Sequence, residues 1–294
     1  MVIELDRVTK RFGPTVALDD VSLEVREEET LGLVGPNGAG KTTAIRILLG
    51  LIRPDRGSAR IYSSGSPFPR IFRSLGYAGG ESEHYAAVSA DRLFRLAADV
   101  RGDASFETAR VLALRLDLDT RTPIRKLSRG NRQKVSIVLC FMGRPRIIIL
   151  DEPTTSLDPV SQQAVLELVR EAGQGGATVL VSSHQLHDIE KACDRICLIH
   201  GGRVRETVTI QEIKRRSRST VTVTLRANLP KGVPALPGVE VRPLGSRTWE
   251  IVTQDVPAAL EQLVPAGIVD IEIRKASLEQ YFQSTLALAS EARR

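Results

Sequence analysis

The sequence predicts an α/β protein with a mainly parallel core sheet and a smaller α+β unit at its C-terminal end. Strand-like apolar runs alternate with helical patterns between residues 30 and 200, and such alternation produces parallel strands joined by crossover helices. A glycine-rich turn at 35–43 joins one of these strands to a helix. The alternation ends near KRRSRST at 214–220, and strand-like runs dominate the sequence after it.

Apolar periodicity and polar helix starts predict the individual elements. In the larger unit we expect strands at 2–8, 21–25 and 30–35, helices at 41–49, 89–100, 106–117 and 128–142, a strand at 146–150, a helix at 159–172, a strand at 177–183, a helix at 185–193 and a strand at 195–200. In the smaller unit we expect strands at 221–227, 239–244, 248–253 and 268–274, and helices at 256–264 and 277–289.

The composition is that of an ordinary soluble protein, with 294 residues, 42% hydrophobic and 26% charged. No apolar run approaches the roughly 18–20 residues of a membrane span, and the first residues lack the apolar core of a signal peptide. We therefore expect a cytoplasmic protein. The net charge of +6 permits attraction to nucleic acid or to an anionic membrane surface, but the excess is spread along the chain except at KRRSR, 214–218. Three cysteines suit reduced thiols.

The stretch GPNGAGKTT at 35–43 fits the phosphate-binding pattern G-x-x-x-x-G-K-[ST]. Its glycines let backbone N–H groups close around phosphate oxygens, and the following helix points its positive end at them. The Lys41 side chain is expected to reach the outer phosphates, and the Thr42 hydroxyl is expected to ligate Mg²⁺. The predicted ATP-binding residues of this loop are Gly35, Pro36, Asn37, Gly38, Ala39, Gly40, Lys41, Thr42 and Thr43.

Two adjacent acids follow the buried run RIIIL at 146–150. This strand carries its carboxylates to the C-terminal edge of the sheet, where ligands bind in such folds. Asp151 can hold Mg²⁺ through a water molecule. Glu152 points the other way by strand alternation, and we expect it to orient or deprotonate an attacking water.

Four motifs in this order resemble the nucleotide-binding subunits of ABC transporters over residues 1–205. They are the phosphate loop, LSRGNRQK at 127–134, ILDEPTTSLD at 149–158 and SSHQ at 182–185. The resemblance implies a P-loop NTPase ABC cassette with an antiparallel N-terminal β subdomain and a helical subdomain at about 80–143. A basic linker at 206–218 and an accessory α+β domain at 219–294 are expected to follow.

The family signature is LSGGQ, which reads LSRGN in this chain, so that Arg129 replaces the first glycine and Asn131 the glutamine. The resemblance implies that Ser128 and the start of the next helix bind the γ-phosphate held by a second subunit. A hydroxyl and free N–H groups at a helix start form an anion site, although Ser128 could also act as the N-cap. The signature residues expected to act across the dimer are Ser128, Arg129, Gly130, Asn131 and Gln133.

Further positions match the family individually. Phe12 corresponds to the aromatic residue that stacks on adenine, and Val16 is also expected to contact ATP. His184 corresponds to the histidine that contacts the γ-phosphate and supports Glu152, so that Lys41, Glu152 and His184 form the expected catalytic set. The loop that joins the two sites of the dimer corresponds to Ser156, Leu157 and Asp158.

One departure concerns the loop after LGYA, where the family usually places a Gln, or a Glu in some branches. That residue touches the metal shell and the transporter subunit. Gly80 occupies the position here, with Glu81 beside it. Two alternatives remain open: the coupling loop lacks this contact, or Glu81 supplies it with an offset of one residue.

The resemblance implies an ATPase that uses Mg²⁺ and pairs with a second copy or a paralogue. It would work at the cytoplasmic face of the membrane with separate membrane-spanning subunits, without a specific nucleic acid. The tail ASLEQYFQSTLA at 276–287 and the N-R-Q-K signature resemble the bacterial drug and antibiotic export branch. One alternative is a soluble ABC ATPase acting on nucleic acid, ribosomes or cofactor assembly, but ribosome-acting members usually carry two cassettes. Another is a regulator that binds ATP without turnover, which retention of Glu152 and His184 disfavours.

Overall fold

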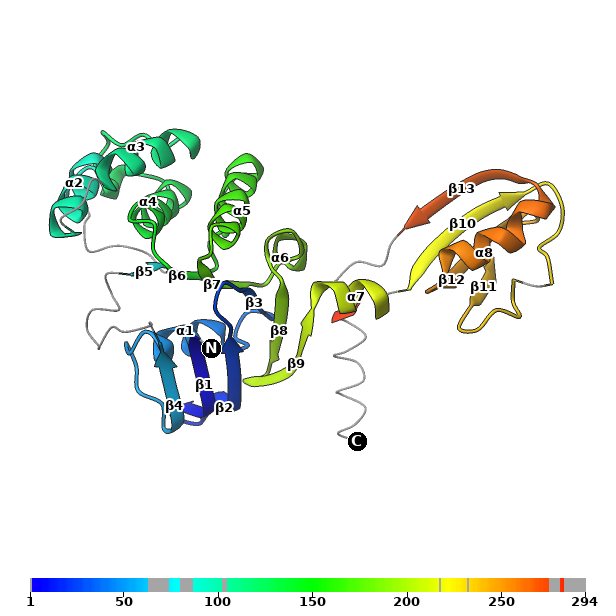
Figure 1. The fold of residues 1–294 in the computed structure, drawn as a ribbon, viewed down its shortest axis with the longest axis horizontal. Helices are drawn as coiled ribbons and strands as arrows, with labels where there is room; N and C mark the ends of the chain where they lie inside the picture. Colours follow the sequence, from blue (N-terminus) through cyan, green and yellow to red (C-terminus); the bar gives the residue numbers. More distant parts are fainter. Residues whose placement is uncertain are drawn as a thin grey trace. The chain divides into compact units, whose positions relative to one another are not determined.

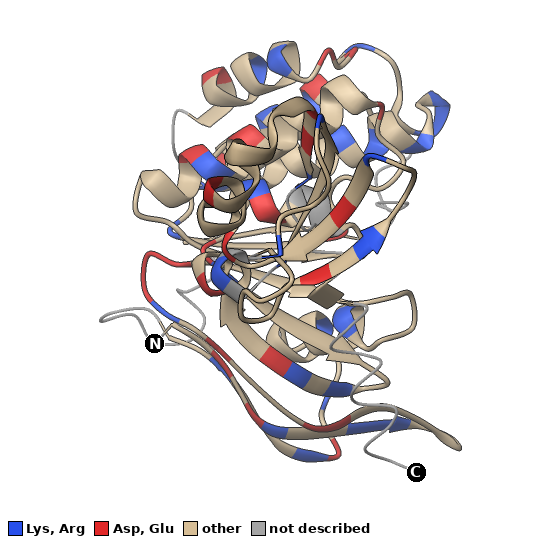
Figure 2. Ribbon diagram, turned by 90° about the vertical axis from the view of Figure 1, so that its right-hand side faces the viewer, with Lys and Arg blue, Asp and Glu red and all other residues tan. Residues whose placement is uncertain are grey.

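The computed structural model describes residues 2–62, 74–79, 87–101, 105–216, 218–231, 233–274 and 281–282. The chain forms two compact units, Met1–Val208 and Thr209–Arg294, whose elements are labelled in Figure 1. Among the described residues there is no helix whose length and hydropathy would let it cross a membrane. Figure 2 shows basic and acidic residues interspersed along the helices and strands.

The central sheet of the first unit has six strands, in the order β5-β6-β7-β3-β8-β9. Neighbouring strands from β5 to β8 run parallel, and β3, β6 and β7 are buried throughout, as expected for strands covered on both faces. The predicted fold class is confirmed. The bounds are β3 (Thr30–Val34), β5 (Leu75–Ala78), β6 (Ile147–Asp151), β7 (Thr178–Ser183), β8 (Arg195–His200) and β9 (Arg203–Thr209).

A three-stranded antiparallel sheet, in the order β2-β1-β4, forms the N-terminal β subdomain. Its strands are β1 (Ile3–Phe12), β2 (Thr15–Val25) and β4 (Arg56–Ile61). The β1–β2 hairpin extends beyond the expected strands because irregularities in its register interrupt the apolar alternation of the sequence. Strand β4 was missed, since RGSARI lacks a strong apolar pattern, and its position depends on pairing with β1.

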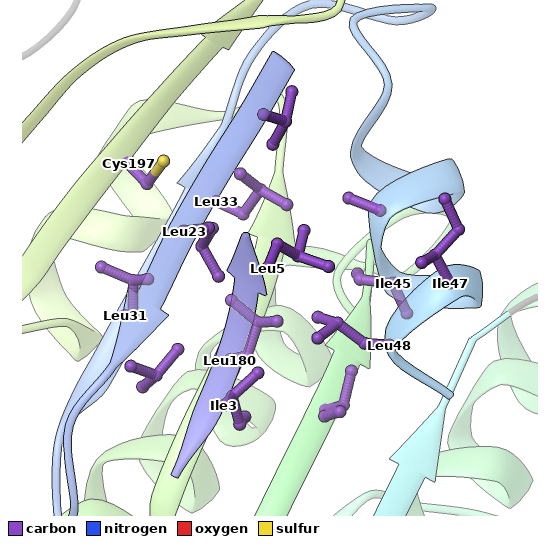
Figure 3. Packing of buried hydrophobic residues seen from close by; sticks show 14 of the residues in the cluster. Ile3, Leu5, Leu23, Leu31, Leu33, Ile45, Ile47, Leu48, Leu180 and Cys197 are labelled. Carbon is purple, nitrogen blue, oxygen red and sulfur yellow. The ribbon is translucent and has the colours of Figure 1, made fainter. Parts of the chain in front are cut away.

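The main hydrophobic core joins the antiparallel sheet, the parallel sheet and α1 (Lys41–Leu48). Figure 3 shows Ile3 and Leu5 of β1 packed with Leu180 of β7 and with Ile45 and Leu48 of α1. This core holds the start of α1 against the end of β3. The phosphate loop is therefore fixed at both of its ends.

The remaining helices of the first unit match their predicted positions closely. The helical subdomain contains α2 (Ala90–Arg101), α3 (Ser105–Arg115), the short η3 (Ile124–Lys126) and α4 (Arg129–Phe141); α3 packs on both α2 and α4, and α4 on β5. Two further helices are α5 (Pro159–Gln174) and α6 (Leu186–Ala192), which pack on each other and on β7. The three cysteines are free and buried, and burial raises the pKa of Cys197 to about 11.

The second unit contains a four-stranded antiparallel sheet in the order β11-β12-β10-β13. Its elements are α7 (Ile210–Arg216), β10 (Ser219–Leu225), β11 (Glu240–Pro243), β12 (Thr248–Thr253), α8 (Val256–Leu263), η4 (Val264–Ala266) and β13 (Ile268–Arg274). The segment 206–218, expected as a linker, contains the end of β9 and α7, whose Ile210 and Ile213 are buried. Of the expected helix at 277–289, only 281–282 lie within the described residues, and these are helical.

Candidate functional site

The phosphate loop lies between β3 and α1, and its Gly38 and Gly40 have positive φ angles, which let the chain turn tightly into the helix. Gly40 is the N-cap of α1 with φ +108°, and a Cβ there would lie 2.6 Å from the Ala17 carbonyl oxygen. Only glycine fits this conformation without strain. The Lys41 side chain is 5% exposed, and its ammonium donates to the carbonyl oxygens of Gly35, at 2.6 Å, and Pro36, at 3.1 Å. The loop thus folds around a buried cation.

Asp151 ends β6 directly beside this loop. Its Oδ1 accepts hydrogen bonds from the Thr42 hydroxyl, at 3.2 Å, and from the Ser182 hydroxyl, at 2.7 Å. A hydroxyl and a carboxylate at hydrogen-bond distance offer the hard oxygen ligands that Mg²⁺ prefers. The residues present therefore fit a magnesium ion, which the Thr42 hydroxyl and the Asp151 carboxylate would hold.

Glu152 connects the phosphate loop to β7. Its backbone has φ +52°, a left-handed conformation that is uncommon outside glycine. One carboxylate oxygen, Oε1, forms an ion pair with the Lys41 ammonium at 3.1 Å, with an alignment too poor for a hydrogen bond. The other, Oε2, lies 2.7 Å from His184 Nδ1 and accepts from the Thr155 hydroxyl at 3.2 Å. Lys41, Glu152 and His184 are therefore brought together.

These contacts decide the charge of the Glu152 carboxylate. Burial by itself raises the pKa of this group, whereas the hydrogen bond with His184 and the Lys41 ammonium lower it. Together these two contacts outweigh the effect of burial, and the pKa of Glu152 lies below the ordinary value of 4.5. Glu152 is therefore ionised at neutral pH, as a general base must be before it accepts a proton.

The signature residues begin α4. Ser128 is its N-cap, and the Ser128 hydroxyl accepts from the Asn131 backbone N–H at 3.2 Å. A Cβ at Gly130 would lie 2.5 Å from the Ser156 carbonyl oxygen, so that only glycine allows this close approach. The expected N-cap role of Ser128 is thus present, and Gly130 packs closely against the loop that contains Ser156.

The loop at 156–158 is tied to α4 within the same chain. Ser156 has φ +68°. Asp158 caps α5, accepting from the backbone N–H and the hydroxyl of Ser161 at 2.9 and 2.6 Å, and it pairs with Lys134 of α4 at 3.7 Å. The bonds from Ser161, with a smaller contribution from Lys134, lower the pKa of Asp158 to about 2. Gly130 and Lys134 of α4 therefore both contact this loop.

An open cleft of about 470 Å³ brings together most of the predicted motifs. It is lined by Asn37, Thr42, Arg46, Arg129, Arg132, Gln133, Asp151, Glu152, Thr155, Ser156 and His184. A larger hollow of about 700 Å³, beside the ends of α3 and α5, contains none of the predicted site residues. The chemistry, rather than the size of the hollow, identifies the functional cleft.

Some predicted residues lie elsewhere. Phe12 ends β1, is 51% exposed and lies under the Lys10 ammonium, 5.5 Å from the ring centre. Neither Phe12 nor Val16, which pairs with Arg11 across the hairpin, lines the cleft. Gly80 and Glu81 lie outside the described residues.

Sequence reasoning missed two residues that hold the acids. Ser182 donates to Asp151 and accepts from the Glu152 backbone N–H at 2.9 Å, and Thr155 donates to Glu152. The signal for Ser182 was its position at the end of a buried strand. Its contact with Asp151 follows from the parallel register of β6 and β7, in which these two residues are paired.

Comparison with known proteins agrees with this geometry. A family model described as ABC transporter matches residues 18–155. The daunorubicin resistance ATP-binding protein DrrA3 of Streptomyces coeruleorubidus is 32% identical, over 95% of this chain and 94% of its own. The Nod factor export ATP-binding protein I of Paraburkholderia xenovorans (strain LB400) is 34% identical, over 68% of each chain.

A solved structure of an ATP-binding subunit of an ABC transporter is 31% identical to this chain, with a TM-score of 0.65. It covers 74% of this chain, and this chain covers 93% of it. Sequence, fold and site geometry lead to the same conclusion: the chain belongs to the ABC transporter ATP-binding proteins and is an ATPase.

Proposed function

We propose that this chain is the ATP-hydrolysing subunit of an exporter and drives transport through separate membrane-spanning subunits. The observation that carries the proposal is one cluster of contacts: Lys41 and His184 both contact Glu152, next to the hydrogen bond from Thr42 to Asp151. The two named relatives serve Nod factor export and daunorubicin resistance, which favours export for this chain. Neither is described as acting on nucleic acid, ribosomes or cofactor assembly.

The residues of the cleft support distinct roles in hydrolysis. Lys41 and the backbone N–H groups of the phosphate loop would bind the β- and γ-phosphates of ATP. Mg²⁺, when held by Thr42 and Asp151, would neutralise phosphate charge. Glu152 would accept a proton from water as the water oxygen bonds to the γ-phosphorus and the bond to the leaving ADP oxygen breaks. His184, hydrogen-bonded to Glu152, would orient that carboxylate.

The start of α4 supports a second ATP contact that belongs to another subunit. Its N-terminal N–H groups and Ser128 form a positive end, and such an end binds phosphate. We propose that Ser128, with the neighbouring Gly130, Asn131 and Gln133, meets the γ-phosphate held by a second copy or a paralogue. Ser156 and Asp158, tied to α4, would then connect the two sites.

We propose that the dimer binds membrane-spanning subunits at the cytoplasmic face of the membrane. Phe12 supports adenine stacking because its ring is half exposed at the end of β1. Two alternatives apply to the coupling loop: either Glu81 takes the place of the missing Gln, or the loop lacks that contact.

The assignment across the interface is tested by mixing two inactive variants, Lys41→Ala and Ser128→Arg. Each homodimer has both sites damaged and should be nearly inactive. A mixed dimer contains one site with both lesions and one site with an intact phosphate loop facing an intact signature. If Ser128 acts across the interface, mixing restores phosphate release. If it acts within its own chain, every site carries one lesion, and mixing restores nothing.

ATP-induced dimerisation of the mixture is measured by gel filtration alongside turnover. Dimers that form with regained hydrolysis support the proposal. A mixture that shows neither dimers nor hydrolysis contradicts the action of Ser128 on a second subunit.

A further inference from the structure

A glycine just after β5 brings a tyrosine hydroxyl close to the acid that ends β6. A Cβ at Gly79 would lie 2.5 Å from the Tyr77 hydroxyl oxygen and 2.7 Å from Asp151 Cβ. The register explains this meeting, because Tyr77 of β5 pairs with Ile149 of β6, two residues before Asp151. Paired residues share one face of a sheet, and so do residues two apart in a strand. The hydroxyl and the carboxylate therefore border the same position at the edge of the sheet.

Both groups have unused hydrogen-bonding capacity. Asp151 accepts from the Thr42 and Ser182 hydroxyls through Oδ1, and its Oδ2 has no hydrogen-bond partner within the described part of the chain. The Tyr77 hydroxyl likewise has none among the described residues. Burial and the nearby Asp151 carboxylate raise the pKa of Tyr77 above its ordinary value of 10. The phenol is therefore a neutral donor beside a carboxylate oxygen that can still accept.

Packing alone does not explain why residue 77 carries a hydroxyl. The Tyr77 ring packs against the main hydrophobic core, which a phenylalanine ring would do equally well. An O–H group that leaves water costs free energy unless it finds a new partner. The partner expected for this donor is polar and lies at the sheet edge, where Thr42 and Asp151 form the proposed magnesium site.

We propose that the Tyr77 hydroxyl positions the magnesium ion by donating a hydrogen bond to a water molecule that the ion shares with Asp151 Oδ2. This inference rests on the proposed magnesium site. Groups that bond to the ligands of a metal fix the orientation of those ligands, and their loss weakens metal binding. Tyr77 makes no bond to the ion and exchanges no proton during hydrolysis. It gives the water shell a contact from β5, in a chain that has Gly80 in place of the Gln of the coupling loop.

The test measures metal binding itself, with Mn²⁺ as the probe for Mg²⁺. Mn²⁺ is titrated into ADP-loaded protein, and the free ion is followed by its electron paramagnetic resonance signal. Tyr77→Phe keeps the ring and removes only the hydroxyl. We expect this variant to bind Mn²⁺ about tenfold more weakly than wild type, the low end for loss of such a contact. Its affinity for ADP in EDTA should be unchanged, because no metal is then present to be positioned.

Tyr62→Phe is the matched control. The Tyr62 hydroxyl donates to Glu4 at 2.9 Å, and Tyr62 does not line the cleft, so this variant should bind Mn²⁺ as wild type does. Melting curves in EDTA check that each variant is folded. If Tyr77→Phe does not fold, Gly79→Ala decides, because its methyl group lies against the Tyr77 oxygen and displaces the hydroxyl. That variant should also bind Mn²⁺ more weakly, and wild-type affinity would overturn the inference.

Wild-type Mn²⁺ affinity in Tyr77→Phe would likewise overturn it. An equal weakening in Tyr62→Phe, or an equal loss of ADP affinity in EDTA, would also do so, since either would indicate a general effect on the structure.

The reference variant Asp151→Asn separates this failure from failure of the metal site. If Asp151→Asn loses Mn²⁺ binding while Tyr77→Phe retains it, the magnesium site stands and only the role of Tyr77 is wrong. If Asp151→Asn binds Mn²⁺ as wild type does, the proposed site itself is wrong, and the inference with it.

Discussion

Replacing Glu152 by Gln tests the catalytic assignment because the amide has nearly the same shape but cannot take a proton. A positioned general base contributes about 10²–10⁴-fold to a reaction, and the lowered pKa of Glu152 shows that it is ionised at working pH. We therefore expect phosphate release by Glu152→Gln to fall by about 10²–10⁴-fold, with ATP binding retained. Gel filtration should show an ATP-bound dimer, since the γ-phosphate is no longer removed.

The same substitution should also lower the thermal stability of the nucleotide-free protein. Lys41 is 5% exposed, and its ion pair with Glu152 is 3.1 Å long. Loss of this charged partner should lower the free energy of unfolding by about 1 kcal/mol, at or below the low end for such contacts. The loss is small because the Lys41 ammonium still donates to the carbonyl oxygens of Gly35 and Pro36. The nucleotide-free variant should melt about 2–4 °C lower. ATP should abolish this difference because its phosphates replace the lost carboxylate.

The matched control is Glu167→Gln, which removes a carboxylate from an ion pair with Arg115 on the surface of α5, away from the cleft. Turnover of this variant should stay close to that of the wild type. If Glu152→Gln retains turnover within threefold of wild type, Glu152 is not the base.

Three further predictions follow from named contacts. Gly130→Ala places a methyl group 2.5 Å from the Ser156 carbonyl oxygen. It should reduce phosphate release at least tenfold, about the effect of one lost positioning interaction, while equilibrium nucleotide binding persists. Unchanged turnover would show that α4 can shift without cost. The stabilisation from Glu152 should be complete above its ordinary pKa of 4.5 and be lost as pH falls through the lower pKa of the folded state, because the folded protein binds this proton less readily than the unfolded protein does. Thermal melts between pH 3 and 7 should show this loss in the wild type. An equal loss in Glu152→Gln would contradict the prediction. A chain ending at Arg216 should fold and bind ATP, since every phosphate motif precedes the unit that begins at Thr209. We propose that this second unit serves regulation or dimer support. A shortened chain that folds but does not bind ATP would instead assign the unit a role in the site.

Much of the fold and site could be predicted from local sequence. β3, β6 and β7 are continuous apolar runs, and α4 and α5 have polar N-caps in Ser128 and Asp158. Such signals depend on neighbouring residues alone. Strand β4 could not be predicted because RGSARI becomes a strand only by pairing with β1. The supporting contacts of Ser182 depend likewise on strand register between distant segments.

By itself, the sequence determined the chemistry of this protein: a glycine-rich loop followed by Lys41, the acids Asp151 and Glu152 after an apolar strand, and a polar helix start at Ser128. Each of these patterns is short, and the backbone geometry of a few neighbouring residues is enough to predict what it can bind. Only the tertiary structure decided which groups meet, because parallel strands from distant parts of the chain end at one sheet edge. There the Lys41 ammonium and the His184 ring set the charge of Glu152, which no single segment of the sequence specifies.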